Sequence, residues 1–158
     1  MVGNRLFQIV ESHSSELSVN LARKLRTSER TPGYRVLPEE DLVTLASQVY
    51  ENLSDWLLTK TSSDIELRYS QLGERRAQQG VPLSQVIWAL LMSKEELWGL
   101  LQHERFADRI LELYGEREFA RMLDNFFDQA LYFAVRGYEQ AVQKKAHAVR
   151  GQRSIAAG

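Results

Sequence analysis

The sequence has 158 residues, of which 44% are hydrophobic and 26% are charged, and these proportions are typical of one soluble globular domain. Its 20 Lys and Arg residues nearly balance its 21 Asp and Glu residues, which disfavours nucleic-acid binding, and the absence of cysteine excludes disulfides, thiolate metal sites and cysteine nucleophiles. No apolar run approaches the ~18 residues that cross a membrane, and there is no secretory hydrophobic region, so we expect a cytoplasmic protein without a membrane partner.

The first segment has apolar side chains at helical spacing, which predicts one amphipathic helix from Leu6 to Leu25. The prolines and the glycine of residues 27–38 interrupt the pattern, so we expect a loop there. A second helix is predicted to begin at the acidic run 39–41, whose charges complement the helix dipole. Its apolar stripe continues to Lys60.

A third helix is predicted after the capping residues 62–64, and its apolar face carries Tyr69 and Arg76. Gly80 ends this helix, because glycine adopts the left-handed conformation without penalty. A fourth helix starts near Pro82 and runs to about residue 103. It is apolar on two sides, so we expect it at the centre of the core. Its Gly99 marks either a close backbone approach or a tolerated glycine.

The last third of the sequence predicts a short helix over 106–114, ended by Gly115, and a long helix from Glu116 to about Arg150. We expect residues 151–158 to form a flexible tail, so that one domain covers residues 1–150. No segment shows the alternation typical of a strand. The sequence therefore predicts an all-α, globin-like bundle of five to six helices with a long C-terminal helix.

Three histidines, His13, His103 and His147, are the candidates for a haem or metal ligand, and no two of them have a metal-ligand spacing. His103 has polar neighbours on both sides, which favours a solvated helix end over a haem ligand. His13 lies on the apolar stripe of the first helix, where a hydrogen-bonded, partly buried histidine is common. We predict neither a cofactor nor a metal.

The sequence contains no arrangement typical of a catalytic site. The acidic runs 39–41 and 95–96 are explained by the helix dipole and by an exposed helix edge. The serines at the predicted helix starts are explained by capping. There is no phosphate-binding glycine loop, nucleophile elbow or metalloprotease pattern. We therefore predict that the protein is not an enzyme.

Arg76 is the residue with the strongest functional interpretation. It follows Tyr69 and Leu72 on the apolar face, so its stem should be buried and its guanidinium must be paired or hydrogen-bonded. It is either a structural arginine that holds loop carbonyls or a carboxylate, or an anion-recognising group in a ligand pocket. The candidate pocket residues are Tyr69, Arg76, Trp88, Trp98 and Phe126. The basic C-terminal residues Lys144, Lys145, Arg150 and Arg153 complement a helix C-terminus better than they suit nucleic acid.

Three segments carry a family resemblance: YRVLPEEDL at 34–42, LGERRAQQGVPL at 72–83 and FFDQALY at 126–132. With these segments the chain resembles the N-terminal sensor domain of RsbRD-type proteins, the RsbT co-antagonists of bacterial stressosomes. The resemblance covers most of residues 4–145 and implies a globin-like fold without haem, dimerisation and a regulatory role. No STAS output domain of the multidomain members is in this sequence, so we expect an excised domain or a short member that acts through a partner.

We therefore predict a non-enzymatic sensory or interaction domain that signals through a protein partner. It is predicted to form a homodimer through its first and last helices and to transmit a state change along the last helix. The rival hypothesis is a globin-like protein that binds haem or another small ligand in its core. A third is a helical assembly domain with no ligand at all.

Overall fold

The computed structural model describes residues 2–103 and 110–157. Six α-helices follow one another in this part of the chain: α1 (Val2–Ser12), α2 (Ser14–Thr27), α3 (Glu39–Tyr50), α4 (Ser62–Gln78), α5 (Leu83–His103) and α6 (Ile110–Ala157). A 3-10 helix, η1 (Pro32–Val36), follows α2, and a π-helical turn, η2 (Asp55–Thr59), follows α3. The described residues contain no strand, so the all-α prediction and its long C-terminal helix are confirmed.

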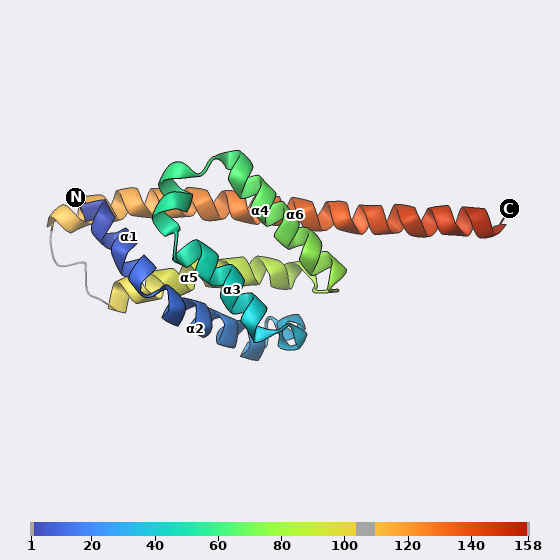
Figure 1. The fold of residues 1–158 in the computed structure, drawn as a ribbon, viewed down its shortest axis with the longest axis horizontal. Helices are drawn as coiled ribbons and strands as arrows, with labels where there is room; N and C mark the ends of the chain where they lie inside the picture. The colour runs from blue at the N-terminus through green and yellow to red at the C-terminus, as the bar shows by residue number, and fades with distance from the viewer. Residues whose placement is uncertain (1, 104–109, 158) are drawn as a thin grey trace.

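Helix α6 is the long axis of the molecule. Helices α1, α4 and α5 pack on its N-terminal part, and α2 packs on α3 and α5 further out (Figure 1). The buried face of α6 includes Phe119, Leu123, Phe126 and Ala130. The C-terminal part of α6 extends well past every other helix (Figure 1).

The first predicted helix is divided into two, which corrects the sequence prediction. The break is at His13, whose Nδ1 lies 2.8 Å from the Ile9 carbonyl oxygen, and Ser12 Oγ donates to the same carbonyl at 3.0 Å. Side chains that bond to nearby carbonyls compete with the helix backbone, and two of them act here in succession. The second predicted helix also ends early, at Tyr50 rather than near Lys60.

The start and the end of α4 are fixed by local hydrogen bonds. Thr61 caps the N-terminus in a capping box with Asp64, one residue before the predicted cap run. At the other end Gly80 has φ +74°, its N–H donates to the Ala77 carbonyl, and the Val81 N–H donates to the Arg76 carbonyl. These two bonds form a Schellman motif, so the predicted helix stop at Gly80 is confirmed.

The C-terminal third differs from the prediction. The predicted short helix 106–114 lies partly outside the described residues, and from Ile110 onward the chain already belongs to α6. The prediction that Gly115 ends a helix is wrong, since α6 continues through it; a glycine inside a helix costs only about 1 kcal/mol, which neighbouring residues offset. Helix α6 also continues to Ala157, and the flexibility of residues 151–158 stays a prediction.

Helices α4 and α6 cross at two glycines. A Cβ atom added to Gly73 would overlap the backbone carbonyl of Ala134, and one added to Gly137 would overlap the backbone of Ser70. Backbone-to-backbone packing of this kind leaves no room for any side chain. By contrast, a Cβ on Gly99 would meet open space, so Gly99 is a tolerated glycine. The crossing fixes the position of α4, and therefore of the polar residues on its inner face.

Candidate functional site

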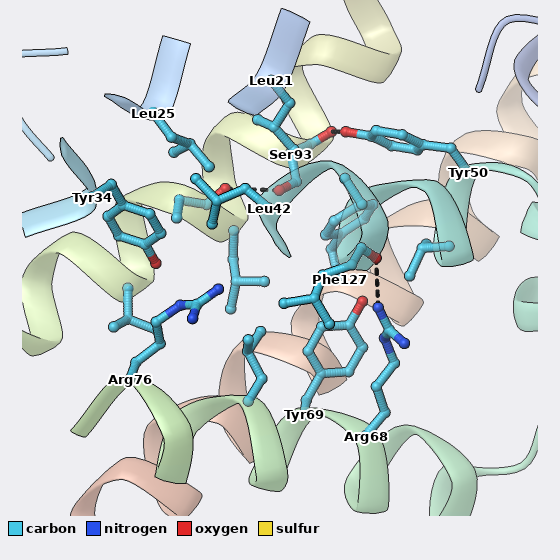
Figure 2. A pocket seen from close by; sticks show the side chains of 17 residues that line it. Leu21, Leu25, Tyr34, Leu42, Tyr50, Arg68, Tyr69, Arg76, Ser93 and Phe127 are labelled. Atoms are coloured by element: carbon cyan, nitrogen blue, oxygen red, sulfur yellow. Dashed lines mark hydrogen bonds between the residues drawn. The ribbon is translucent and has the colours of Figure 1, made fainter. Parts of the chain in front are cut away.

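A cavity of about 80 Å³ lies on the inner face of α4, where α3, α5, α2, η1 and α6 supply the other walls (Figure 2). Most of its lining side chains are aliphatic. The polar ones are Tyr34, Tyr50, Arg68, Tyr69, Arg76 and Ser93. None of the residues that line this cavity is acidic, so two arginines and several hydroxyl groups share an apolar space.

Arg76 lies at one end of this cavity. It follows Tyr69 by two turns on the same face of α4, and only 4% of its surface is exposed. One terminal nitrogen, Nη1, donates to Gln79 Oε1 at 2.8 Å, and the guanidinium carbon lies 5.4 Å from the centre of the Tyr34 ring. Its Nε is buried without an acceptor. Within the described part of the chain, no carboxylate forms an ion pair with it.

Arg68 closes the other end, two turns before Arg76 on the same helix. Its two terminal nitrogens donate to the Leu45 carbonyl at 2.6 Å and to Gln48 Oε1 at 2.9 Å, both on α3. Its guanidinium carbon lies 5.5 Å from the Trp56 ring centre and 5.6 Å from that of Tyr69. Arg68 therefore bridges α4 to α3 across the cavity wall, and its terminal donors are already occupied.

Burial keeps the three tyrosines in their neutral form. Burial raises the pKa of Tyr34, and the charge of Arg76 and hydrogen bonding to it offset only part of this effect. Burial likewise raises the pKa of Tyr69, against the charge of Arg68. The pKa of Tyr50 is raised by burial and also by nearby Glu96. Its hydroxyl donates to the Ser93 carbonyl at 2.7 Å. The cavity therefore offers cations and hydroxyl donors at neutral pH.

The residues predicted as a core pocket separate into two groups. Tyr69 and Arg76 line the cavity, and Phe126 lies behind it, with its ring 5.8 Å from that of Tyr69. Trp98 instead packs edge-on against Phe119, and Trp88 lies beneath the guanidinium of Arg30 on the surface of the bundle. Helical spacing predicts which residues share a face but not which helix that face meets.

Four of the polar cavity residues were not among the predicted site residues: Tyr34, Tyr50, Arg68 and Ser93. Tyr34 belongs to the predicted loop, and the apolar spacing that indicates burial in a helix is absent there. Tyr34 does lie in the segment 34–42 that carries the family resemblance, and this was the signal from which it could have been predicted as a site residue. Arg68 lies one residue before Tyr69, at the edge of the apolar face of α4. A sequence pattern cannot distinguish such an arginine from an ordinary solvated one.

No histidine is among the described residues that line the cavity. His13 Nδ1 contacts the Ile9 carbonyl, His147 is exposed on α6, and the side chain of His103 lies outside the described residues. No group of three His, Cys, Asp or Glu side chains in the described ranges could hold a metal ion. In the described part of the chain, no helix is both long enough and apolar enough to cross a membrane.

A family model for the N-terminal domain of the RsbT co-antagonist protein RsbRD matches residues 16–153. The chain belongs to this family. The match includes every residue that lines the cavity, as well as the α4–α6 crossing. The RsbRD family resemblance is thus confirmed, and with it a stressosome-related sensory and regulatory domain; the globin-like architecture stays a prediction. No curated protein and no solved structure gave a significant match.

Proposed function

We propose that this RsbRD N-terminal domain is a non-enzymatic cytoplasmic module that signals through protein–protein contacts. It acts as a homodimer, and the C-terminal part of α6 is the surface through which the two copies meet and pass a state change to a signalling partner. Family membership supports the regulatory role, and the shape of α6 is the observation that supports the dimer.

Helix α6 is longer than its own chain can cover. Its 48 residues span ~70 Å, and every residue from Val142 to Arg153 is exposed. A helical segment in water is only marginally stable without packing on one face. The apolar face of α1 cannot supply this packing to a second copy, because Leu6, Phe7 and Val10 are already buried within the chain. We therefore narrow the predicted interface from both terminal helices to α6.

A column of valines marks the face of α6 that a partner would cover. Val135, Val142 and Val149 are separated by seven residues each, which is the repeat of a coiled coil. The side chains of Val142 and Val149 are large apolar groups that remain 49% and 42% exposed. Pairing two α6 helices in parallel would bring the same valines of both copies together and remove them from water.

The chemistry of the cavity supports a role other than catalysis. Its lining residues include no carboxylate, histidine or cysteine, so the lining serine, Ser93, has none of these general bases beside it in the cavity wall, and its hydroxyl donates to the Ala89 carbonyl at 2.8 Å. Tyr34 and Tyr69 keep their protons at neutral pH because their pKa values are raised, so they are not available as bases. What remains are hydrogen-bond donors and positive charge, which suit binding.

Size-exclusion chromatography with light scattering tests the dimer. The account predicts twice the chain mass of 18.2 kDa at micromolar concentration. Replacing Val142 and Val149 with Glu should give a folded monomer, because both side chains are exposed. The control variant carries Gln140→Glu and His147→Glu, which add the same charge on the opposite face of α6, and it should stay dimeric. A parent protein that elutes as an 18.2 kDa monomer would refute the proposal.

A further inference from the structure

The guanidinium of Arg76 is a buried cation that lacks a counter-charge. A buried charge is costly unless it is paired, and several kcal/mol per ion is the usual scale of that cost. Among the described residues its clear hydrogen-bond acceptor is Gln79 Oε1, and its buried Nε has no acceptor. Figure 2 shows the side chain pointing into the cavity, towards the hydroxyl end of Tyr34.

Arg68 also has no carboxylate partner among the described residues and has a buried Nε without an acceptor, but its terminal nitrogens are engaged differently. Arg68 gives its terminal donors to the Leu45 carbonyl and Gln48 Oε1, so it is held by α3. The nearby carboxylate of Glu96 is already paired with Lys24 Nζ at 2.6 Å. Arg76, with its one bond from Nη1 to Gln79, is therefore held less fully by the chain than Arg68, and its natural partner is an anion from solution.

The size and the lining of the cavity restrict that anion. Its volume of about 80 Å³ is about half that of the ~150 Å³ apolar cavity known to hold benzene, so it fits roughly three or four heavy atoms. Leu21, Leu42, Val86 and Leu90 supply apolar walls that would leave a fully hydrated inorganic ion poorly matched. A short hydrocarbon chain with one negative end suits both the wall and the cation.

We propose that the cavity binds a short-chain monocarboxylate of the size of acetate. Its carboxylate accepts hydrogen bonds from the Arg76 guanidinium and from the Tyr34 hydroxyl, and its methyl group lies against the aliphatic wall. No bond is made or broken, so this is a sensory ligand rather than a substrate.

An outer groove of about 400 Å³ leads to this site. It lies between α3 and α4, and Leu45, Arg68 and Leu72 line both the groove and the cavity. The groove is also lined by the exposed side chains of Arg75 and Asp41, whose charges oppose each other. An anion that enters by the groove would pass the Arg68 bridge to reach Arg76.

The site is also connected to α6. The Arg76 carbonyl accepts the Val81 N–H at 3.0 Å, and the Val81 carbonyl accepts the Tyr138 hydroxyl at 2.5 Å. Tyr138 lies one residue after the glycine at the α4–α6 crossing. A ligand that draws Arg76 inward therefore acts on the turn that holds α6. This inference deepens the proposed function. The effect of the ligand on signalling through α6 rests on that function, whereas the binding of the ligand does not.

The test is a titration of the full chain with sodium acetate, followed by NMR of the arginine Nε–H groups at constant ionic strength. One Nε–H resonance, absent from the spectrum of Arg76→Met, should shift and saturate. Hexanoate, the neutral amide acetamide and the planar anion nitrate should not produce this shift. Saturation by acetamide, or by nitrate as tightly as by acetate, would overturn the proposal.

Variants separate recognition from general charge effects. Arg76→Met should weaken acetate binding by at least ~10-fold, and Tyr34→Phe by ~3–10-fold, as expected for a charge-assisted and a single neutral hydrogen bond. Arg75→Met removes the same charge from the exposed groove and should bind acetate within about twofold of the parent. If Arg76→Met does not fold, Tyr34→Phe still decides, because unchanged binding there would overturn the assignment. Acetate binding to a monomer would refute the dimer alone, and a dimer without acetate binding would refute this inference alone.

Discussion

The close packing of α4 on α6 can be tested by making the same Gly→Ala substitution at the crossing and away from it. The two changes are expected to have opposite effects on stability. Gly137→Ala adds one methyl group where a Cβ would overlap the backbone of Ser70. Gly99→Ala adds the same methyl group near the C-terminal end of α5, where nothing lies within contact distance. Both changes improve helix propensity by about 1 kcal/mol, so the difference between them isolates the packing at the crossing.

The magnitudes follow from this geometry. Gly99→Ala should raise the free energy of unfolding by about 1 kcal/mol. Gly137→Ala gains the same propensity, but the atom it must displace is backbone and cannot rotate away, so we expect a net loss of about 1–3 kcal/mol. For a chain of this size each kcal/mol corresponds to about 2–4 °C in Tm. Gly99→Ala should therefore melt above the parent, and Gly137→Ala well below it.

Urea denaturation followed by circular dichroism measures both variants, with Gly73→Ala as a second test of the crossing. Gly73→Ala should behave like Gly137→Ala, because its Cβ would overlap the Ala134 carbonyl. The reasoning fails if Gly137→Ala is as stable as Gly99→Ala. That result would mean that α4 and α6 are further apart than the structure places them.

Three further predictions concern the α4 stop, the buried tyrosines and haem. Gly80→Val should lower the free energy of unfolding in urea by ~1 kcal/mol or more, because a β-branched residue resists the φ of +74°. Gly80→Asn should lose less. Equal stability of Gly80→Val and the parent would refute the turn geometry. Burial raises the pKa of Tyr50 above the ordinary tyrosine value of 10.0, so the stability that this burial contributes is fully present below pH 10.0 and is lost as the pH rises through the raised pKa. Urea midpoints across this range should fall less steeply for Tyr50→Phe, and an unchanged slope would contradict the assignment. Hemin titration should give no sharp Soret band; one that disappears in His103→Ala would establish the globin-like alternative.

The sequence was informative where one residue decides a backbone conformation. Gly80 with Pro82 two residues later predicted the end of α4, and the Schellman bonds explain why. The burial of Arg76 followed from its helical spacing with Tyr69, since both residues occur on one apolar face. These are local features, and they did not depend on knowing which helices pack together.

The remaining features depended on tertiary contacts or on weak local competition. The apolar stripe of the first segment runs through His13 without interruption, so the break made by two side-chain hydrogen bonds left no mark in the spacing. Gly115 resembled a helix stop because another glycine, Gly80, ends α4, yet Gly115 lies inside α6. Gly73 and Gly137 occur on the apolar faces of their helices. A glycine in such a place can indicate a close helix crossing, but it does not identify the partner helix.

Pulsed electron spin resonance on α6 tests the central claim most directly, because the chain has no cysteine and one introduced thiol gives one label per copy. Arg150→Cys places that label on the protruding, fully exposed part of the helix. The account predicts a short, narrow distance between the two copies, and the signal should disappear in the Val142→Glu, Val149→Glu background. No dipolar coupling in the labelled parent at micromolar concentration would contradict signalling through a paired α6.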